Sequence, residues 1–219
     1  PALPDSGAFA LVARGLRAEG GGLLAEQTVQ FELVAQANSA RLLRAEALDA
    51  HRVVLHFDKS IRQTEDIGLF SLGEGIAIEA VHVDGASVLL TLSESAALRP
   101  LGRAYRVAVD GLLDKDGLPV RGESSFLFAA ADLRRAGPFP NPYIARRGVL
   151  VFGFLPRQAT VAIYDAQGQL LRQLEERDGD GGVLWDGTNE ANAPLASGVY
   201  YYRIMAGGQS KVGSLALVR

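Results

Sequence analysis

The sequence predicts an all-β protein built from β-sandwiches in series. Helical periodicity is almost absent, and short alternating runs of apolar and polar residues are separated by Gly, Asp and Pro. Of the 219 residues, 48% are apolar, which is enough for a substantial core. A chain of this length accommodates one large domain or two small ones.

An internal repeat divides the chain. Residues 7–34 (GAFALVARGLRAEGGGLLAEQTVQFELV) resemble residues 103–128 (RAYRVAVDGLLDKDGLPVRGESSFLF), and Gly15–Leu16 aligns with Gly111–Leu112. The spacing of roughly 95 residues is a common size for an immunoglobulin-like (Ig-like) sandwich. The second copy has a whole domain in front of it and the first does not. We therefore expect two Ig-like β-sandwiches in tandem, preceded by the last strands of a truncated third.

The expected segments follow from this repeat and from the composition. Residues 1–36 are predicted to be the C-terminal strands of a preceding repeat, 37–131 an Ig-like spacer domain, 132–137 a linker and 138–219 a C-terminal sandwich. The chain starts at Pro1 and not at Met, which suggests a processed or truncated product. No signal peptide is visible.

The middle segment contains a strand and a hairpin. Val53–Phe57 alternates, so its odd-numbered residues should share the core face. Ala77–Val83 and Ser87–Leu92 should pair across Asp84–Gly85, a strong two-residue turn signal.

The middle segment resembles the bacterial Ig-like domains that recur in tandem on cell surfaces. The resemblance covers about residues 40–130, and the matching residues include Val53–Asp58 (VVLHFD), Tyr105–Leu112 (YRVAVDGL), Asp114–Gly117 (DKDG) and Phe126. It implies a spacer or scaffold and no chemistry.

The last segment contains six short predicted strands that fit a small sandwich. They are Val149–Leu155, Ala159–Asp165, Leu170–Glu175, Val183–Trp185, Val199–Met205 and Val212–Val218. Three prolines within residues 138–142 should stiffen the approach to this domain, because each fixes its own φ angle and restricts the preceding residue.

Residues 138–219 resemble the C-terminal sorting domain (type A) of type IX secretion cargo and the related Ig-like domain of the flagellar hook-capping protein. The motifs are Pro140–Pro142, Trp185–Gly187, Pro194–Gly198, Val199–Ile204 and the closing strand Lys211–Arg219. Gly153 departs from the pattern, which has an aromatic or aliphatic residue there. The residues expected to serve sorting are Pro140, Asn141, Pro142, Gly198, Tyr200, Lys211, Val212, Gly213, Leu215, Leu217 and Arg219.

The resemblance implies a route and partners. The folded domain would pass through the periplasm of a Gram-negative bacterium, be recognised by an outer-membrane translocon and be processed by a sortase-like enzyme. The protein would then be secreted or held at the cell surface. A partner could read the last strand by adding its own strand to an exposed edge, and we expect Lys211–Arg219 to offer that edge.

No catalytic residue, cofactor or metal site is expected. His51 and His56 should point to opposite faces of their strands. Asp114–Gly117 and Asp178–Gly181 resemble fragments of Ca²⁺ loops but lack the closing Glu, so plain turns are favoured and adventitious calcium stays open. Glu175–Glu176 is interpreted as solvated charge.

Aromatic residues near the end of the chain are interpreted as core. Tyr200, Tyr202 and Ile204 should face inward, whereas Tyr201 should face solvent with its alternate neighbours. A single exposed tyrosine is not a saccharide platform. Trp185 is expected to anchor the core.

Charge and composition exclude other classes. The formal net charge is −3 with 22 scattered Lys and Arg residues, so a nucleic-acid surface is not expected. No apolar run approaches the ~18–20 residues of a membrane span. The chain has no Cys and therefore no disulfide framework.

Three functions remain open. The first is the non-catalytic C-terminal region of a secreted or cell-surface multidomain protein, with a spacer and a sorting domain behind further upstream domains. The second is a structural or adhesive surface subunit that self-assembles through strand complementation. The third is the glycan-binding tail of a secreted hydrolase.

Overall fold

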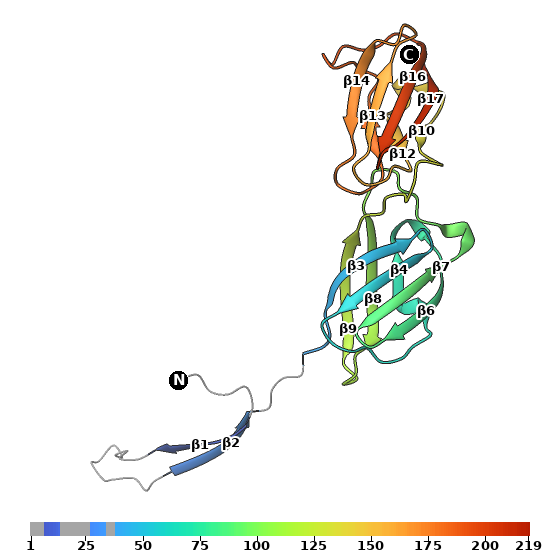
Figure 1. Cartoon of the computed structure of the whole chain (residues 1–219). Coiled ribbons are helices and arrows are strands. Elements are labelled where there is room, and N and C mark those ends of the chain that lie inside the picture. Colours follow the sequence, from blue (N-terminus) through green and yellow to red (C-terminus); the bar gives the residue numbers. More distant parts are fainter. Residues whose placement is uncertain (1–6, 14–26, 34–37) are drawn as a thin grey trace. The chain divides into compact units, whose positions relative to one another are not determined.

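The computed structural model describes residues 7–13, 27–33 and 38–219 and divides the chain into two compact units, Pro1–Asn38 and Ser39–Arg219 (Figure 1). In the first unit, β1 (Gly7–Ala13) and β2 (Gln27–Leu33) form an antiparallel hairpin with Phe9 opposite Phe31. The Gly15–Leu16 corner of the repeat lies outside the described residues. The all-β prediction is confirmed, because no α-helix occurs in the described ranges.

Residues 39–126 form a sandwich of a four-stranded and a three-stranded sheet. The four-stranded sheet has the order β3 (Leu42–Asp49), β4 (Arg52–Phe57), β7 (Ser87–Leu92), β6 (Ile78–Asp84). The facing sheet has the order β5 (Phe70–Leu72), β8 (Tyr105–Leu113), β9 (Pro119–Phe126). Three 3-10 turns, Ile67–Leu69, Gly73–Gly75 and Glu94–Ala96, join the strands. We call this part the middle sandwich.

Local patterns in the middle sandwich are confirmed. Val53, Leu55 and Phe57 of β4 are buried, as the alternation predicts. The β6–β7 hairpin turns through Gly85, whose φ of 58° lies in the left-handed region. Tyr105 stacks on Phe126 with ring centroids 5.7 Å apart.

Asp114 is fully buried and acts as a hydrogen-bond hub for the backbone. Its Oδ1 accepts from the amides of Asp116 and Leu118, each at 2.9 Å, and its Oδ2 accepts from the amide of Ala40 at 3.0 Å. Burial alone would raise the pKa of this carboxyl, but the hydrogen bonds from Leu118, Ala40 and Asp116 hold the pKa below its ordinary value. The predicted DKDG turn therefore also holds Ala40, close to where the chain enters the middle sandwich.

Residues 137–218 form the terminal sandwich, which pairs a three-stranded with a five-stranded sheet (Figure 1). The smaller sheet has the order β10 (Gly137–Phe139), β12 (Leu150–Gly153), β15 (Val183–Trp185). The larger has the order β11 (Tyr143–Ile144), β17 (Gln209–Val218), β16 (Gly198–Ala206), β13 (Thr160–Tyr164), β14 (Leu170–Glu175). A 3-10 turn covers Ala145–Arg147, and only β11 runs parallel to its partner.

Aromatic side chains fill the core of the terminal sandwich. Trp185 is 1% exposed, and its ring lies 6.1 Å from that of Tyr143 and 6.5 Å from that of Tyr200. Phe152 meets Tyr202 edge-on at 5.4 Å. The predicted core anchor and the predicted faces of β16 are confirmed, with Tyr200 partly and Tyr202 fully buried.

The two sandwiches meet through close backbone contacts inside the second unit. The amide of Phe154 donates to the carbonyl of Pro100 at 2.7 Å. A Cβ on Gly153 would overlap the side chain of Leu101, and a Cβ on Gly182 would overlap the backbone of Gly102. Gly153 therefore departs from the expected pattern because this junction leaves no room for a side chain.

The segment expected to be a linker contributes to the terminal core. Leu133 and Ala136 are buried there among the residues that surround Trp185. Across the described parts of the chain, no helix is long and apolar enough to cross a membrane.

Candidate recognition site

All of the residues expected to serve sorting lie on β17 or next to it. Gly198 and Tyr200 of β16 stand opposite Leu217 and Leu215 of β17. Asn141, between two exposed prolines, reaches the other side of β17. The structure thus brings together residues that are up to 79 positions apart, from Pro140 to Arg219.

Asn141 covers the outer edge of β17. Its Nδ2 donates to the carbonyl of Ser214 at 3.2 Å, and its Oδ1 accepts from the amide of Ala216 at 3.1 Å. A side-chain amide offers the same donor and acceptor as a peptide group, so it takes the place of a neighbouring strand. β11 then pairs with Leu217 and Val218.

The expectation of an exposed edge along all of Lys211–Arg219 is therefore wrong. From Ser214 to Val218 the edge is closed by Asn141 and by β11. At Gln209–Gly213 no strand in the described part of the chain pairs with the outer side of β17. The open edge is limited to this first half of the strand.

Three site residues on β17 serve the fold. Leu215 and Leu217 are buried in the core. Gly213 lies opposite Tyr202, and a Cβ at this position would overlap the tyrosine hydroxyl. The absent side chain lets the ring of Tyr202 lie across the strand.

The remaining site residues close loops or face solvent. The Nη2 of Arg219 donates to the carbonyl of Gly187 at 2.8 Å, and its Nε donates to the carbonyl of Leu195. The Tyr200 hydroxyl donates to the carbonyl of Ala196 at 2.8 Å. Lys211 Nζ donates to the carbonyl of Arg134 at 2.8 Å, whereas Val212 is 71% exposed.

The opposite edge of the same sheet is also covered, which the sequence did not predict. The Glu190 amide donates to the carbonyl of Leu171 at 2.8 Å, and Glu190 Oε1 accepts from the amide of Gln173 at 2.7 Å. These bonds occupy the outer side of β14. The only signal in the sequence is a polar loop after Trp185, and such loops are common.

Glu176 is buried, so its interpretation as solvated charge is wrong. It is 1% exposed, and its Oε1 accepts from the amides of Gly179 at 2.8 Å and Gly181 at 3.1 Å. Its Oε2 accepts from the amide of Gln158 at 3.1 Å. Glu175 is the last residue of β14 and reaches solvent, whereas Glu176, directly after the strand, is buried.

The turn after Glu176 brings three carboxylates together. Ligand oxygens of Glu176, Asp178 and Asp180 lie within 4.8 Å of one another. Burial raises the pKa of Asp180, and the nearby Asp178 and Glu176 raise it further against a hydrogen bond from Gly182. The cluster could attract a cation, but Glu176 already uses its oxygens to hold the turn.

A line of Ser87, His56 and Glu46 crosses the outer face of the middle sandwich. His56 Nδ1 lies 3.3 Å from Ser87 Oγ, and its Nε2 lies 3.0 Å from Glu46 Oε1. The side-chain types match a hydrolytic triad. However, they lie on adjacent strands of an open sheet, outside the cavity at the junction of the sandwiches and the groove over β13, β16 and β17.

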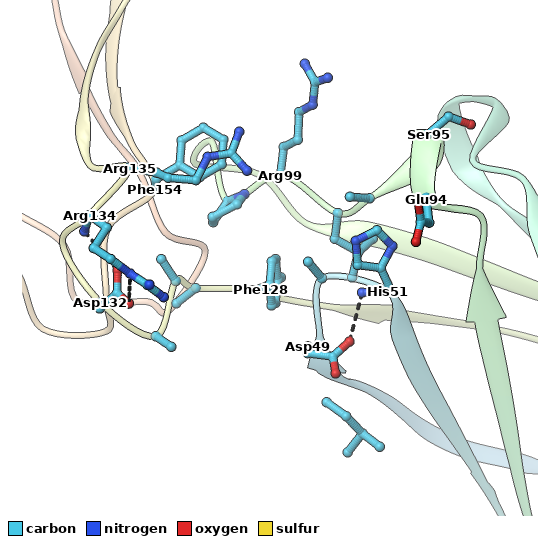
Figure 2. Close-up of a pocket in the computed structure, with 18 residues that line it drawn as sticks. Asp49, His51, Glu94, Ser95, Arg99, Phe128, Asp132, Arg134, Arg135 and Phe154 are labelled. Atoms are coloured by element: carbon cyan, nitrogen blue, oxygen red, sulfur yellow. Dashed lines mark hydrogen bonds and ion pairs between the residues drawn. The ribbon is translucent and has the colours of Figure 1, made fainter.

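A cavity of about 580 Å³ lies at the junction of the sandwiches (Figure 2). Its lining carries three carboxylates and three guanidinium groups, from Asp49, Glu94, Asp132, Arg99, Arg134 and Arg135. Arg134 Nε lies 2.7 Å from Asp132 Oδ2, and the Arg135 guanidinium lies over the ring of Phe154 at 4.4 Å. The cavity therefore has no preference for a ligand of one charge.

One family model matches part of the terminal sandwich. Residues 156–210 match the model of the FlgD Ig-like domain. The resemblance to the Ig-like domain of the hook-capping protein is confirmed for this stretch. No curated protein matches the chain.

Solved structures with similar folds include three bacterial proteins. The N-terminal part of the bacterial S-layer protein SbsC has 16% identity and a TM-score of 0.38, with 83% of this chain and 45% of that chain covered. PorZ, described as a surface component of the type IX secretion system of Porphyromonas gingivalis, has 17% identity and a TM-score of 0.38, covering 79% and 30%. Latent PorU of Porphyromonas gingivalis has 16% identity and a TM-score of 0.31, covering 97% and 24%. The chain spans less than half the length of each of these structures.

Proposed function

We propose that the chain is a non-catalytic region of a secreted or cell-surface multidomain protein. In this proposal residues 138–219 are a sorting domain that an outer-membrane translocon recognises, and residues 37–131 are a spacer. The observation that carries it is the gathering of the residues expected to serve sorting on β17 and next to it. The FlgD Ig-like match over residues 156–210 supports the domain type.

The motif residues then have two roles. Buried or clamping residues, such as Leu215 and Arg219, keep β17 in the folded domain. Exposed residues at its open half, above all Val212, are available to a partner. A translocon subunit would add a strand beside Gln209–Gly213, where the edge is not covered.

Surface attachment is part of the same proposal. A sortase-like enzyme would cut before the terminal sandwich and join the upstream part to a surface acceptor. In this proposal the cut falls in residues 132–137, and Leu133 and Ala136 would first have to leave the core.

The test is export of a fused reporter. Residues 39–219 joined to a periplasmic reporter should bring it to the surface of a cell that has the type IX translocon, whereas residues 39–131 should not. A reporter with residues 39–219 that stays in the periplasm would sink the proposal.

Two matched variants then locate the recognised surface. Val212→Lys should stop export because Val212 lies at the open half of β17, and Val199→Lys should not, although Val199 is exposed to 57% on the neighbouring strand. Thermal unfolding should be similar for both variants. Equal export by both would move recognition away from this edge.

A second candidate is a structural or adhesive subunit. The β1–β2 hairpin has only two strands, and within the described segments no third strand pairs with it. Such a hairpin is marginally stable alone and could complete a sheet in another copy. This function predicts concentration-dependent assembly that is lost when residues 1–35 are deleted, and a monomer insensitive to the deletion would argue against it.

A further inference from the structure

A shallow groove crosses the outer face of the five-stranded sheet of the terminal sandwich. It has a volume of about 610 Å³ and is lined by residues of β13, β16 and β17 and of the turn after β13. Tyr164 of β13 stands directly opposite Tyr201 of β16, which stands opposite Ser214 of β17. In the next row on this face, Arg203 stands opposite Val212.

The polar ends of these side chains have no partner within the described chain. The hydroxyls of Tyr105, Tyr143 and Tyr200 each donate to a backbone carbonyl. By contrast, in the part of the chain that the structure describes, the hydroxyls of Tyr164 and Tyr201 form no hydrogen bond and Arg203 forms no ion pair. Tyr201 is 50% exposed and Val212 71%, so the groove carries apolar surface beside polar groups that a ligand can reach.

Backbone groups are not available to a ligand in this groove. β16 is paired on both sides along its length, and β13 lies between β16 and β14. The outer edges of the sheet are covered at Ser214–Ala216 by Asn141 and at Leu171–Gln173 by Glu190. The edge of β17 is open at Gln209–Gly213, but its peptide groups point along the plane of the sheet and not toward the groove on its face. A ligand lying in the groove therefore meets no free peptide group, which disfavours an extended peptide, because a peptide needs partners for its own amides.

We propose that this groove binds a saccharide in the pyranose form. The rings of Tyr164 and Tyr201 would pack against the C–H faces of successive sugar units. The two phenol hydroxyls, Ser214 Oγ and the Arg203 guanidinium would hydrogen-bond to sugar hydroxyls. The volume falls within the range of small-ligand sites, which is roughly 300–1,000 Å³.

This site revises the prediction made from the sequence. The sequence predicts a single exposed tyrosine, Tyr201, which is too little for a platform, whereas the structure adds a second ring from Tyr164, 37 positions earlier in the chain. Cross-strand pairing of β13 with β16 brings the two together. The proposal is independent of export and goes beyond the sorting function.

The experiment uses the full chain and three named probes: chitohexaose, cellohexaose and hexagalacturonate. Titration followed by two-dimensional amide NMR should move the signals of β13, β16 and the first half of β17, with at least one probe binding with a Kd of about 1 mM. Tyr201→Ala and Tyr164→Ala should each weaken binding roughly tenfold, because each removes one stacking ring. Val199→Ala, on the same strand and face but outside the groove, should leave binding unchanged.

Further variants separate the contributions. Tyr201→Phe keeps the ring and should lose less affinity than Tyr201→Ala. Because this pair tests the stacking ring by itself, the proposal stays testable if Tyr164→Ala fails to fold. Arg203→Ala should weaken hexagalacturonate more than the neutral probes. The proposal is overturned if no probe perturbs the groove at about 10 mM, if Tyr201→Ala binds as well as the unaltered chain, or if only a proline-rich peptide occupies the groove.

Discussion

The middle and terminal sandwiches each bury one carboxylate and use it in the same way. Asp114 and Glu176 both present one oxygen to two amides of the following turn and the other oxygen to a distant amide. The charge of Lys59 also lowers the pKa of Asp114, but each of the three backbone hydrogen bonds lowers it more. Backbone donors are therefore the main partners of both buried acids.

The two sandwiches differ in how their cores are filled and how their edges end. The middle core is mostly aliphatic with one stacked aromatic pair, and a Cβ on Gly122 of β9 would lie only 3.3 Å from Leu42 of β3, so its sheets approach at that side. In the terminal core the aromatic side chains contact one another around Trp185 and Tyr202, and side chains cover part of both edges of its larger sheet. Two sandwiches of similar architecture can therefore differ in how their strand edges are protected from pairing with other strands.

Truncating the aromatic centre of the terminal sandwich should have the largest effect. Trp185→Ala should lower the free energy of unfolding by about 4 kcal/mol, because it removes a buried ring and leaves a cavity. Denaturant unfolding followed by far-UV circular dichroism measures the change. Leu184→Ala, at an adjacent residue that is 57% exposed, should change the free energy by less than about 0.5 kcal/mol.

The two buried carboxylates can be compared by amide substitution. Glu176→Gln should cost about 3 kcal/mol, because one backbone amide would face an NH₂ group instead of an acceptor. Asp114→Asn should shift the unfolding transition in the same direction for the same reason. Asp116→Asn is the control, because that side chain lies at the surface beside Lys115. An unchanged free energy of unfolding for Glu176→Gln would show that the two buried carboxylates do not play the same role.

The stability of the middle sandwich at acidic pH should depend on the ionised carboxylate of Asp114. Its pKa is lowered in the folded state, so its contribution to stability is complete above the ordinary pKa of about 3.9 and is lost as the pH falls through the lower folded value. The unaltered chain should therefore lose stability more steeply below about pH 4 than Asp114→Asn does. Parallel pH profiles of the two proteins would contradict this.

A substitution at the junction of the two sandwiches tests whether they unfold in a single transition. Gly182→Ala should cost about 2 kcal/mol, because the added Cβ overlaps the backbone of Gly102. The fluorescence of Trp185, the only tryptophan, reports the terminal sandwich, and circular dichroism reports both. The two transitions should separate in the variant. Gly198→Ala, whose Cβ would meet only the ring of Tyr200 at 3.8 Å, should behave like the unaltered chain.

Uncovering the outer edge of β17 should have the smallest effect on the free energy of unfolding, but it should cause the chain to self-associate. Asn141→Ala should cost about 1 kcal/mol for the two lost hydrogen bonds and uncover Ser214–Ala216. Sedimentation velocity should then show self-association that the unaltered chain does not show at the same concentration. A monomeric variant would mean that Asn141 does not protect the edge.

Local pattern predicted most of the strands and their faces. The alternation in β4 and β16 is a property of neighbouring residues, and burial followed it. Strong turn dipeptides such as Asp84–Gly85 likewise act over a few residues.

Contacts between distant residues could not be predicted in this way. Asn141 reaches β17 across more than seventy residues, and Glu190 reaches β14 across seventeen. Glu176 looked like surface charge because its three donors come from a turn and a loop that only the fold brings together. The second ring of the groove, Tyr164, was missed because cross-strand pairing is not visible in one strand alone.

The covered edges have a consequence for chains in which such sandwiches follow one another. A covalently joined neighbour is present at an effective concentration that reaches the millimolar range for short connections. At that concentration an uncovered strand would pair with the next domain during folding, which is a characteristic failure of tandem proteins. Asn141 and Glu190 fill outer hydrogen-bonding positions of β17 and β14 from within the same domain and leave Gln209–Gly213 of β17 without a covering strand or side-chain amide in the described part of the chain. They therefore favour correct folding of each sandwich in a crowded array, even though each contributes little to its stability.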